Sequence, residues 1–190
     1  SGEDSSADEK YGDLYYIILS NNEVRITDCT YFCGGDIVIP AYIEDRPVTE
    51  IGEGAFENRG EIDSVTIPNT VRSIGDYAFF GCEEMRTIYM SDSVSYIGKD
   101  VFTNCVHLEK VRMPAYLEKI PEGMFTSCEA LTTIEIPSGV TSIGDSAFCQ
   151  TKISSISLPD RLEYIGVDAF LNTKLESVWI PDSVTTIDKG

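Results

Sequence analysis

The segment Ile67–Phe79, with the sequence IPNTVRSIGDYAF, decides the fold because it returns almost unchanged as Ile136–Phe148, IPSGVTSIGDSAF. Related copies recur along the chain, and the apolar residue that ends each apolar-x-apolar tripeptide stands at positions 67, 90, 113, 136, 158 and 180. These positions are spaced by 23, 23, 23, 22 and 22 residues. An earlier copy ends at Ile39, 28 residues upstream of Ile67, and its extra length fits an insertion around residues 44–47. A fixed period of this length is typical of solenoid proteins.

Each copy contains the same physical elements. The apolar-x-apolar tripeptide alternates with period two, which predicts a short strand with one buried face. The proline that follows it in most copies lacks an N–H group and ends the strand pairing. The chain then returns through a Val-x-x-Ile-Gly segment and turns again at an Ala-Phe corner, where we expect a short helical turn. One coil cannot bury its own apolar side chains, so the coils must stack, with equivalent strands side by side in a parallel sheet. The corner phenylalanines should then form one buried column: Phe56, Phe79, Phe102, Phe125, Phe148 and Phe170.

The sequence predicts three parts. Residues 1–10 are polar and acidic and are expected to be a disordered leader, either a tether left after removal of a secretion signal or partly a remnant of protein production. Residues 11–36 are predicted to be an N-terminal capping hairpin, because residues 14–19 and 23–28 resemble two strands on either side of a turn. Residues 37–190 are the predicted solenoid, a mostly β fold of about six repeats plus a partial last one.

The last copy stops at Gly190, before the Ala-Phe corner of its repeat. An uncovered solenoid end exposes apolar side chains and unpaired strand edges. Either the chain was cut there, the last half-coil closes the stack, or a second molecule covers it by self-association at the C-terminal end.

The charge of the chain excludes some partners. With 32 acidic and 14 basic residues, the formal net charge is −18, which argues against binding to nucleic acid or to anionic membrane surfaces. No run of about 18 apolar residues occurs, so we expect no transmembrane segment. The acidity is expected mainly to keep an elongated protein in solution.

The cysteines and carboxylates are interpreted as structural. Cys82, Cys105 and Cys128 share one repeat position that threonine fills in later copies, which predicts a small buried residue rather than a bridge. Cys29 and Cys33, in the capping region, either pair or stay free, and Cys149 is expected to be unpaired. The acidic residues before the Ala-Phe corner are expected to cap a helical turn. A calcium ladder is the alternative, but no repeat offers the several oxygen ligands that calcium needs. We therefore expect no metal and no cofactor.

Nothing in the sequence supports an enzyme. His107 is the only histidine, and it stands in a segment predicted to be a solvent-facing loop. The chain also lacks a phosphate-binding glycine loop and a GxSxG nucleophile motif. The prediction is a protein without catalytic residues.

The outer face of the strands varies from copy to copy, whereas the buried positions repeat. The residue between the two buried strand positions is, in order, Val38, Thr66, Tyr89, Arg112, Glu135, Ser157 and Trp179. Tyrosine, arginine and tryptophan most often anchor interfaces. We therefore predict a partner-binding face, with Tyr89, Arg112 and Trp179 as anchors, made of Thr66, Tyr89, Arg112, Glu135, Ser157, Trp179, Thr87, Lys110 and Thr133. The alternative is a solvated face whose aromatic residues are present because they favour strands.

The recurring pattern xxIPxxVxxIGxxAFxxCxxLxxVxIP resembles the BspA-type leucine-rich repeats of bacterial surface proteins, most closely at Ile67–Ile88 and Ile136–Ile156. The similarity extends over about residues 37–190. It implies a right-handed leucine-rich repeat solenoid with a parallel sheet on one side, export to the cell surface or beyond, and a role in binding. Pro121 in place of the usual glycine departs from the pattern, and we expect it to change local packing only.

These inferences together predict a non-catalytic binding module of a secreted or surface-anchored bacterial protein. The resemblance implies adhesion to host or neighbouring-cell macromolecules, with a protein, such as one of the extracellular matrix, or a glycan as the partner. The alternative is a structural spacer that displays another domain.

Overall fold

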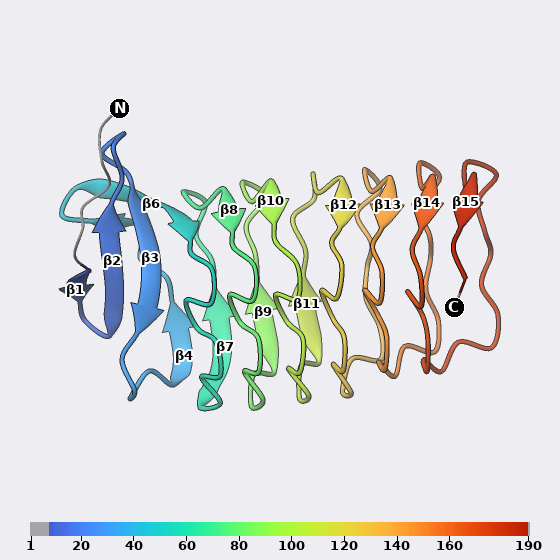
Figure 1. Cartoon of the computed structure of the whole chain (residues 1–190), viewed down its shortest axis with the longest axis horizontal. Helices are drawn as coiled ribbons and strands as arrows, with labels where there is room; N and C mark the ends of the chain where they lie inside the picture. The colour runs from blue at the N-terminus through green and yellow to red at the C-terminus, as the bar shows by residue number, and fades with distance from the viewer. Residues whose placement is uncertain (1–7, 190) are drawn as a thin grey trace.

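The structure, a computed structural model, describes residues 8–189. It is a parallel β-solenoid of about seven turns whose coils stack along the long axis of the molecule (Figure 1). No helix that could cross a membrane occurs among the described residues.

The N-terminal end of the stack is covered by a hairpin. Strands β2 (Leu14–Ile18) and β3 (Val24–Cys29) pair antiparallel, close to the predicted boundaries. β3 then pairs parallel with β6 (Arg46–Ile51), which joins the hairpin to the first coil, while the short β5 (Tyr42–Ile43) folds back antiparallel on β6.

The predicted leader lies mostly outside the described residues, which begin at Asp8. Two residues assigned to it belong instead to β1 (Glu9–Tyr11), which pairs antiparallel with β2. The Tyr16 hydroxyl donates a hydrogen bond of 2.9 Å to the Glu9 carboxylate, and this contact together with the strand pairing orders the segment.

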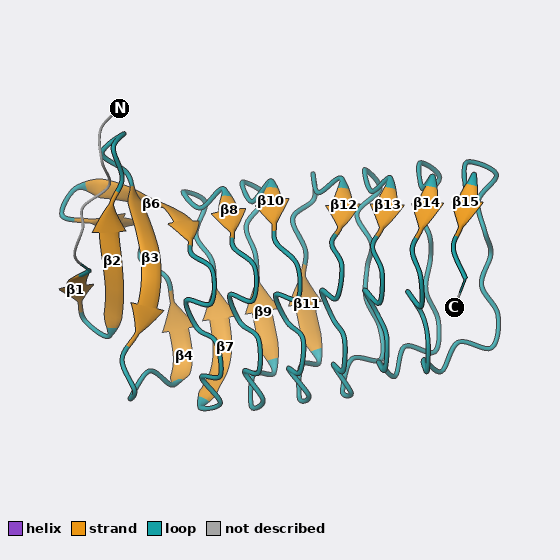
Figure 2. Cartoon of the chain, in the orientation of Figure 1, coloured by secondary structure: helices purple, strands orange, loops and turns teal. Residues whose placement is uncertain are grey.

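Two ladders of parallel strands run along the stack, one on each side of the coil (Figure 2). The first ladder consists of β4 (Gly35–Val38), β7 (Ile62–Thr66), β9 (Thr87–Tyr89) and β11 (Lys110–Arg112). It contains the apolar-x-apolar tripeptides. Beyond β11 the tripeptides no longer form paired strands, so the predicted sheet on this side is shorter than expected.

The second ladder contains the Val-x-x-Ile-Gly segments, which the sequence predicted only as a return path. It begins with β6, β8 (Ser73–Ile74) and β10 (Tyr96–Ile97). It resumes as a separate sheet of β12 (Lys119–Ile120), β13 (Ser142–Ile143), β14 (Tyr164–Ile165) and β15 (Thr186–Ile187). The interval between β10 and β12 is wider in Figure 1 than the others along this ladder.

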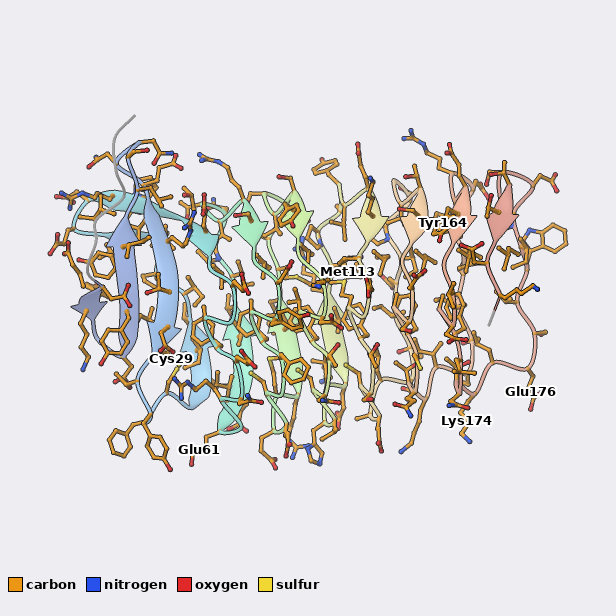
Figure 3. All side chains as sticks on the ribbon, viewed as in Figure 1. Cys29, Glu61, Met113, Tyr164, Lys174 and Glu176 are labelled. Carbon is orange, nitrogen blue, oxygen red and sulfur yellow. The ribbon has the colours of Figure 1, made fainter. Side chains whose placement is uncertain are left out.

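The core is a single apolar column between the two ladders. The six corner phenylalanines stack nearly parallel, with neighbouring ring centroids 5.1, 5.7, 5.6, 5.6 and 5.4 Å apart. All but Phe170 are fully buried, which confirms the predicted aromatic column. Side chains fill the interior along the whole stack, from Cys29 in the cap past the buried Met113 (Figure 3).

The corners are tight turns, and the expectation of short helical turns is wrong: residues 8–189 contain no helix. In one corner the Phe80 N–H donates to Tyr77 O within the turn, whereas the Phe79 N–H donates to Val101 O of the next coil, both at 3.0 Å. A helix needs each N–H to donate within its own segment. Left-handed backbone at Tyr77 (φ 57°) and Gly81 (φ 69°) permits this alternation and interrupts any helical run.

Candidate binding surfaces

The structure aligns half of the predicted face into two rows on the first ladder. Thr66 pairs in register with Tyr89, and Tyr89 with Arg112. Beside this row, Thr87 pairs with Lys110. Equivalent strands lie about 4.8 Å apart, so neighbouring side chains of a row are close enough to touch one partner together.

The remaining predicted residues follow in coils whose apolar-x-apolar tripeptides form no paired strands. Thr133, Glu135, Ser157 and Trp179 are all exposed, as expected, but the backbone that holds them forms no ladder. Trp179 is 80% exposed and Tyr89 is 47% exposed. Four coil steps separate these two side chains, which is roughly 19 Å at the usual strand spacing. A partner that contacts both must therefore span most of the face.

Arg112 is less available to a binding partner than its position in the sequence suggested. Its Nη2 donates to both Asp92 carboxylate oxygens, at 3.1 Å each, and its Nη1 donates to the Met90 carbonyl. The Asp92 carboxylate accepts the Ala115 N–H at 2.9 Å as well, and this N–H and the guanidinium together lower the pKa of Asp92. Arg112 is thus held by the preceding coil.

Two shallow hollows lie where the pairing of the first ladder stops. One lies between Arg112 and Glu135 and the other between Glu135 and Ser157, each with a volume of about 460 Å³. They make the surface of the face uneven on either side of Glu135.

A larger cleft, of about 800 Å³, opens on the opposite side of the coil between β10 and β12. Tyr96, Lys99, Tyr116, Lys119 and Pro121 are among the residues that line it. We call this opening the Pro121 seam. Sequence reasoning noted Pro121 as an irregularity but did not connect it with a surface.

The hydrogen bonds between the other coils of the second ladder show why the seam exists. The glycine N–H of a coil donates to the isoleucine carbonyl of the coil before it, as from Gly75 to Ile51 and from Gly98 to Ile74, each at 2.8 Å. The same bond recurs from Gly144 to Ile120 at 2.8 Å. Pro121 has no N–H, so the equivalent bond to Ile97 cannot form.

The proline ring also forces the two neighbouring strands apart. A Cβ atom placed on Gly75 would meet the Glu53 nitrogen at 2.5 Å, and one on Gly98 would meet the Asp76 nitrogen at 2.5 Å. This slot therefore takes glycine because backbone of the preceding coil crowds it, and not because φ is positive. Pro121 brings a whole ring to the same place, which β10 and β12 can accommodate only by separating.

The stacked cysteines and acidic residues have structural roles. The thiols of Cys82, Cys105 and Cys128 each donate to the phenylalanine carbonyl one coil earlier, at 3.1, 3.2 and 3.2 Å. Burial raises the pKa of the Cys82 thiol to about 12, so it stays neutral. Contrary to expectation, Asp76 caps no helical turn: it accepts the Lys99 N–H of the next coil at 3.0 Å.

The other chemically reactive side chains lie apart. Cys29 and Cys33 are buried and free in the cap, and the hydrogen bond between them lowers the pKa of Cys33 and raises that of Cys29. His107 is exposed, with its Nδ1 2.8 Å from the Glu83 carbonyl oxygen. Within residues 8–189, no group of three or more His, Cys, Asp or Glu side chains could hold a metal ion.

Comparison with solved structures supports the fold. A T. pallidum leucine-rich repeat protein is 25% identical, with a TM-score of 0.78, and the match covers 90% of this chain and 92% of that one. A leucine-rich cell surface protein from Faecalibacterium prausnitzii A2-165 is 26% identical, with a TM-score of 0.63. That match covers 97% of this chain but only 55% of the F. prausnitzii chain. The pneumococcal vaccine antigen PcpA shares the fold at 18% identity, with a TM-score of 0.54 and coverage of 94% and 71%.

Sequence comparison identifies the repeats themselves. None of the curated proteins compared with the chain matches it significantly. The family model described as "BspA type Leucine rich repeat region" matches residues 49–172 in six copies. Since these residues make up more than half of the chain, the protein belongs to the BspA-type leucine-rich repeat family.

Proposed function

We propose that this chain is a non-catalytic binding module of a protein secreted by a bacterium or held on its surface. It binds a protein or glycan of a host or a neighbouring cell through the outer side chains of the first ladder and the coils that continue it. Two of the solved structures that it resembles are named as a cell surface protein and a vaccine antigen, which supports this location.

One observation carries the proposal. Inward positions repeat the same apolar residues and are buried, whereas the outward row presents a different side chain in each coil. Tyr89 and Trp179 stand in this row, and their side chains are 47% and 80% exposed. Exposed aromatic residues cost little in folding and contribute strongly to interfaces once a partner covers them.

The test begins with a screen of the protein against matrix proteins and glycans. For a partner so found, the double substitution Tyr89→Ala, Trp179→Ala should weaken binding by about 2 kcal/mol or more, roughly 30-fold, because both anchors are lost. The melting temperature should barely move, because exposed residues contribute little to stability.

The matched control is the double substitution Tyr31→Ala, Phe32→Ala, which removes two aromatic rings that are 80% and 83% exposed in the loop after β3. This control should bind normally. If the Tyr89 and Trp179 variant binds as tightly as the unaltered protein, the chosen face is wrong.

The elongated stack favours a second function, that of a structural spacer. β1 and β15 lie at opposite ends of the molecule, so domains joined to the two ends would be held apart by the length of the stack (Figure 1). A folded domain encoded after residue 190 would support this role. A spacer would tolerate the Tyr89 and Trp179 substitutions in every binding assay, which separates it from the first proposal.

A further inference from the structure

The Pro121 seam leaves strand edges on both of its walls. In β10, the Tyr96 N–H donates to Arg72 O at 3.2 Å and the Gly98 N–H to Ile74 O at 2.8 Å, so these two residues face β8. Ile97, which lies between them, directs its N–H and C=O toward the seam, because alternate residues of a strand pair on opposite sides.

The other wall has the complementary arrangement. The Thr141 N–H donates to Glu118 O and the Gly144 N–H to Ile120 O, both at 2.8 Å, so Glu118 and Ile120 face β13. Lys119 between them directs its N–H and C=O toward β10. Within the part of the chain that the structure describes, no backbone hydrogen bond joins β10 to β12.

We propose that the seam binds an extended peptide segment of a partner protein, which enters as an added strand between β10 and β12. Strand addition uses main-chain N–H and C=O groups of an exposed strand edge, and here two such edges face one cleft. The volume of about 800 Å³ lies within the range of ligand pockets in proteins. A sugar lacks the regular alternation of N–H and C=O groups that matches two facing strand edges.

The lining indicates which side chains the peptide carries. The inner part of the seam is apolar: Ile97 retains 6% exposure where its counterpart Ile74 is fully buried. A peptide side chain that points inward is therefore apolar. Successive side chains of a strand point to opposite faces, so those next to it point outward.

The outer rim offers the Lys119 ammonium group to an acidic side chain at an outward position of the peptide. Lys99 and Lys119 line the seam together with Glu118, and the Asp76 carboxylate is already held by the Lys99 N–H at 3.0 Å. The exposed rings of Tyr96 and Tyr116 flank the opening. The seam thus takes an extended segment that alternates apolar and acidic residues.

This site is separate from the face of the proposed function. Tyr89 lies on the first ladder, and the seam interrupts the second ladder on the opposite side of the coil. Different substitutions therefore test the two proposals.

The first experiment titrates the whole chain into fluorescently labelled hexapeptides that alternate valine or isoleucine with glutamate, and follows fluorescence anisotropy. At least one of them should bind saturably. Binding should fall at least tenfold when the peptide is N-methylated at alternate residues, because the methyl groups block main-chain pairing. If no alternating peptide binds, or if N-methylation changes nothing, strand addition is wrong.

The second experiment closes the seam with Pro121→Gly, which introduces the residue that occupies this position in the other coils. The new N–H can reach the Ile97 carbonyl and the ring is gone, so the amides of Ile97 and Lys119 should exchange hydrogen at least tenfold more slowly. Peptide affinity should fall at least tenfold. The control Pro159→Gly alters a proline outside the seam and should bind normally.

Two further variants keep the test decisive if Pro121→Gly folds poorly. Tyr96→Ala and Lys119→Glu change exposed rim side chains, and each should weaken peptide binding at least threefold. The Tyr89 and Trp179 variant should bind the peptide normally. Normal peptide binding by Pro121→Gly, or by both rim variants, would overturn the proposal.

Discussion

The inner column of this solenoid and the outer row of its first ladder belong to the same coils, yet they follow opposite rules. Inside, phenylalanine recurs from coil to coil, and each buried ring stacks on the ring of the next coil. Outside, Thr66, Tyr89 and Arg112 stand side by side with nothing in common. Stacking therefore constrains the interior and leaves the outer row free to vary for a partner.

The largest expected effect comes from interrupting the inner column. Phe102→Ala should reduce the free energy of unfolding by about 3–5 kcal/mol, because it leaves a cavity in a fully buried stack. Phe102 lies between Phe79 and Phe125, at centroid distances of 5.7 and 5.6 Å. Urea unfolding followed by circular dichroism measures the change.

The outer counterpart in this comparison is Trp179→Ala, which removes a ring that is 80% exposed. It should change the free energy of unfolding by no more than about 0.5 kcal/mol. Similar losses for Phe102→Ala and Trp179→Ala would remove the distinction between the two regions.

The next effect concerns the crowded glycines of the second ladder. Gly144→Ala places a Cβ atom 2.5 Å from the Glu122 nitrogen, so it should cost about 1–3 kcal/mol of unfolding free energy through overpacking. Gly60→Ala is the control, because an added Cβ there meets nothing within 4 Å. The same urea titration should find Gly60→Ala neutral or slightly stabilising, and equal costs at the two sites would show that coil crowding is not the cause.

The smallest effect on stability appears only above pH 9. Burial raises the pKa of Cys82 from 9.0 to about 12, so the folded state prefers the neutral thiol. This contribution to stability is complete below pH 9, and it is lost as the pH rises toward 12. At pH 10 it should be reduced by about 1 kcal/mol.

Cys82→Thr isolates that contribution, since threonine occupies the same slot at Thr151 and donates to the Phe148 carbonyl at 2.9 Å. The variant should match the unaltered protein at pH 7 and exceed its stability at pH 10. Parallel stability curves from pH 7 to pH 10 would contradict the assignment.

Much of the architecture could be predicted from the period of the sequence. The phenylalanine column and the exposure of Tyr89 and Trp179 follow from where apolar residues recur, because one repeat already displays which positions point inward. The two strands of the cap follow from two strand-like runs on either side of a turn.

The rest depends on contacts between coils, which a single repeat does not display. The corners are not helical because half of their N–H groups donate to the next coil. Arg112 is held by Asp92, 20 residues earlier in the chain, through a contact that only the stacking register creates. Pro121 opens the ladder because its slot is one where each coil meets the backbone of the preceding one.

Amide hydrogen exchange across the whole chain tests the coil-to-coil hydrogen bonding most directly. We expect slow exchange at Gly52, Gly75, Gly98, Gly144 and Gly166, each bonded to an isoleucine carbonyl of the preceding strand in its sheet. We expect fast exchange at Ile97 and Lys119, on the walls of the seam. Fast exchange at these glycines, or protection at Lys119 equal to theirs, would contradict this hydrogen bonding between coils.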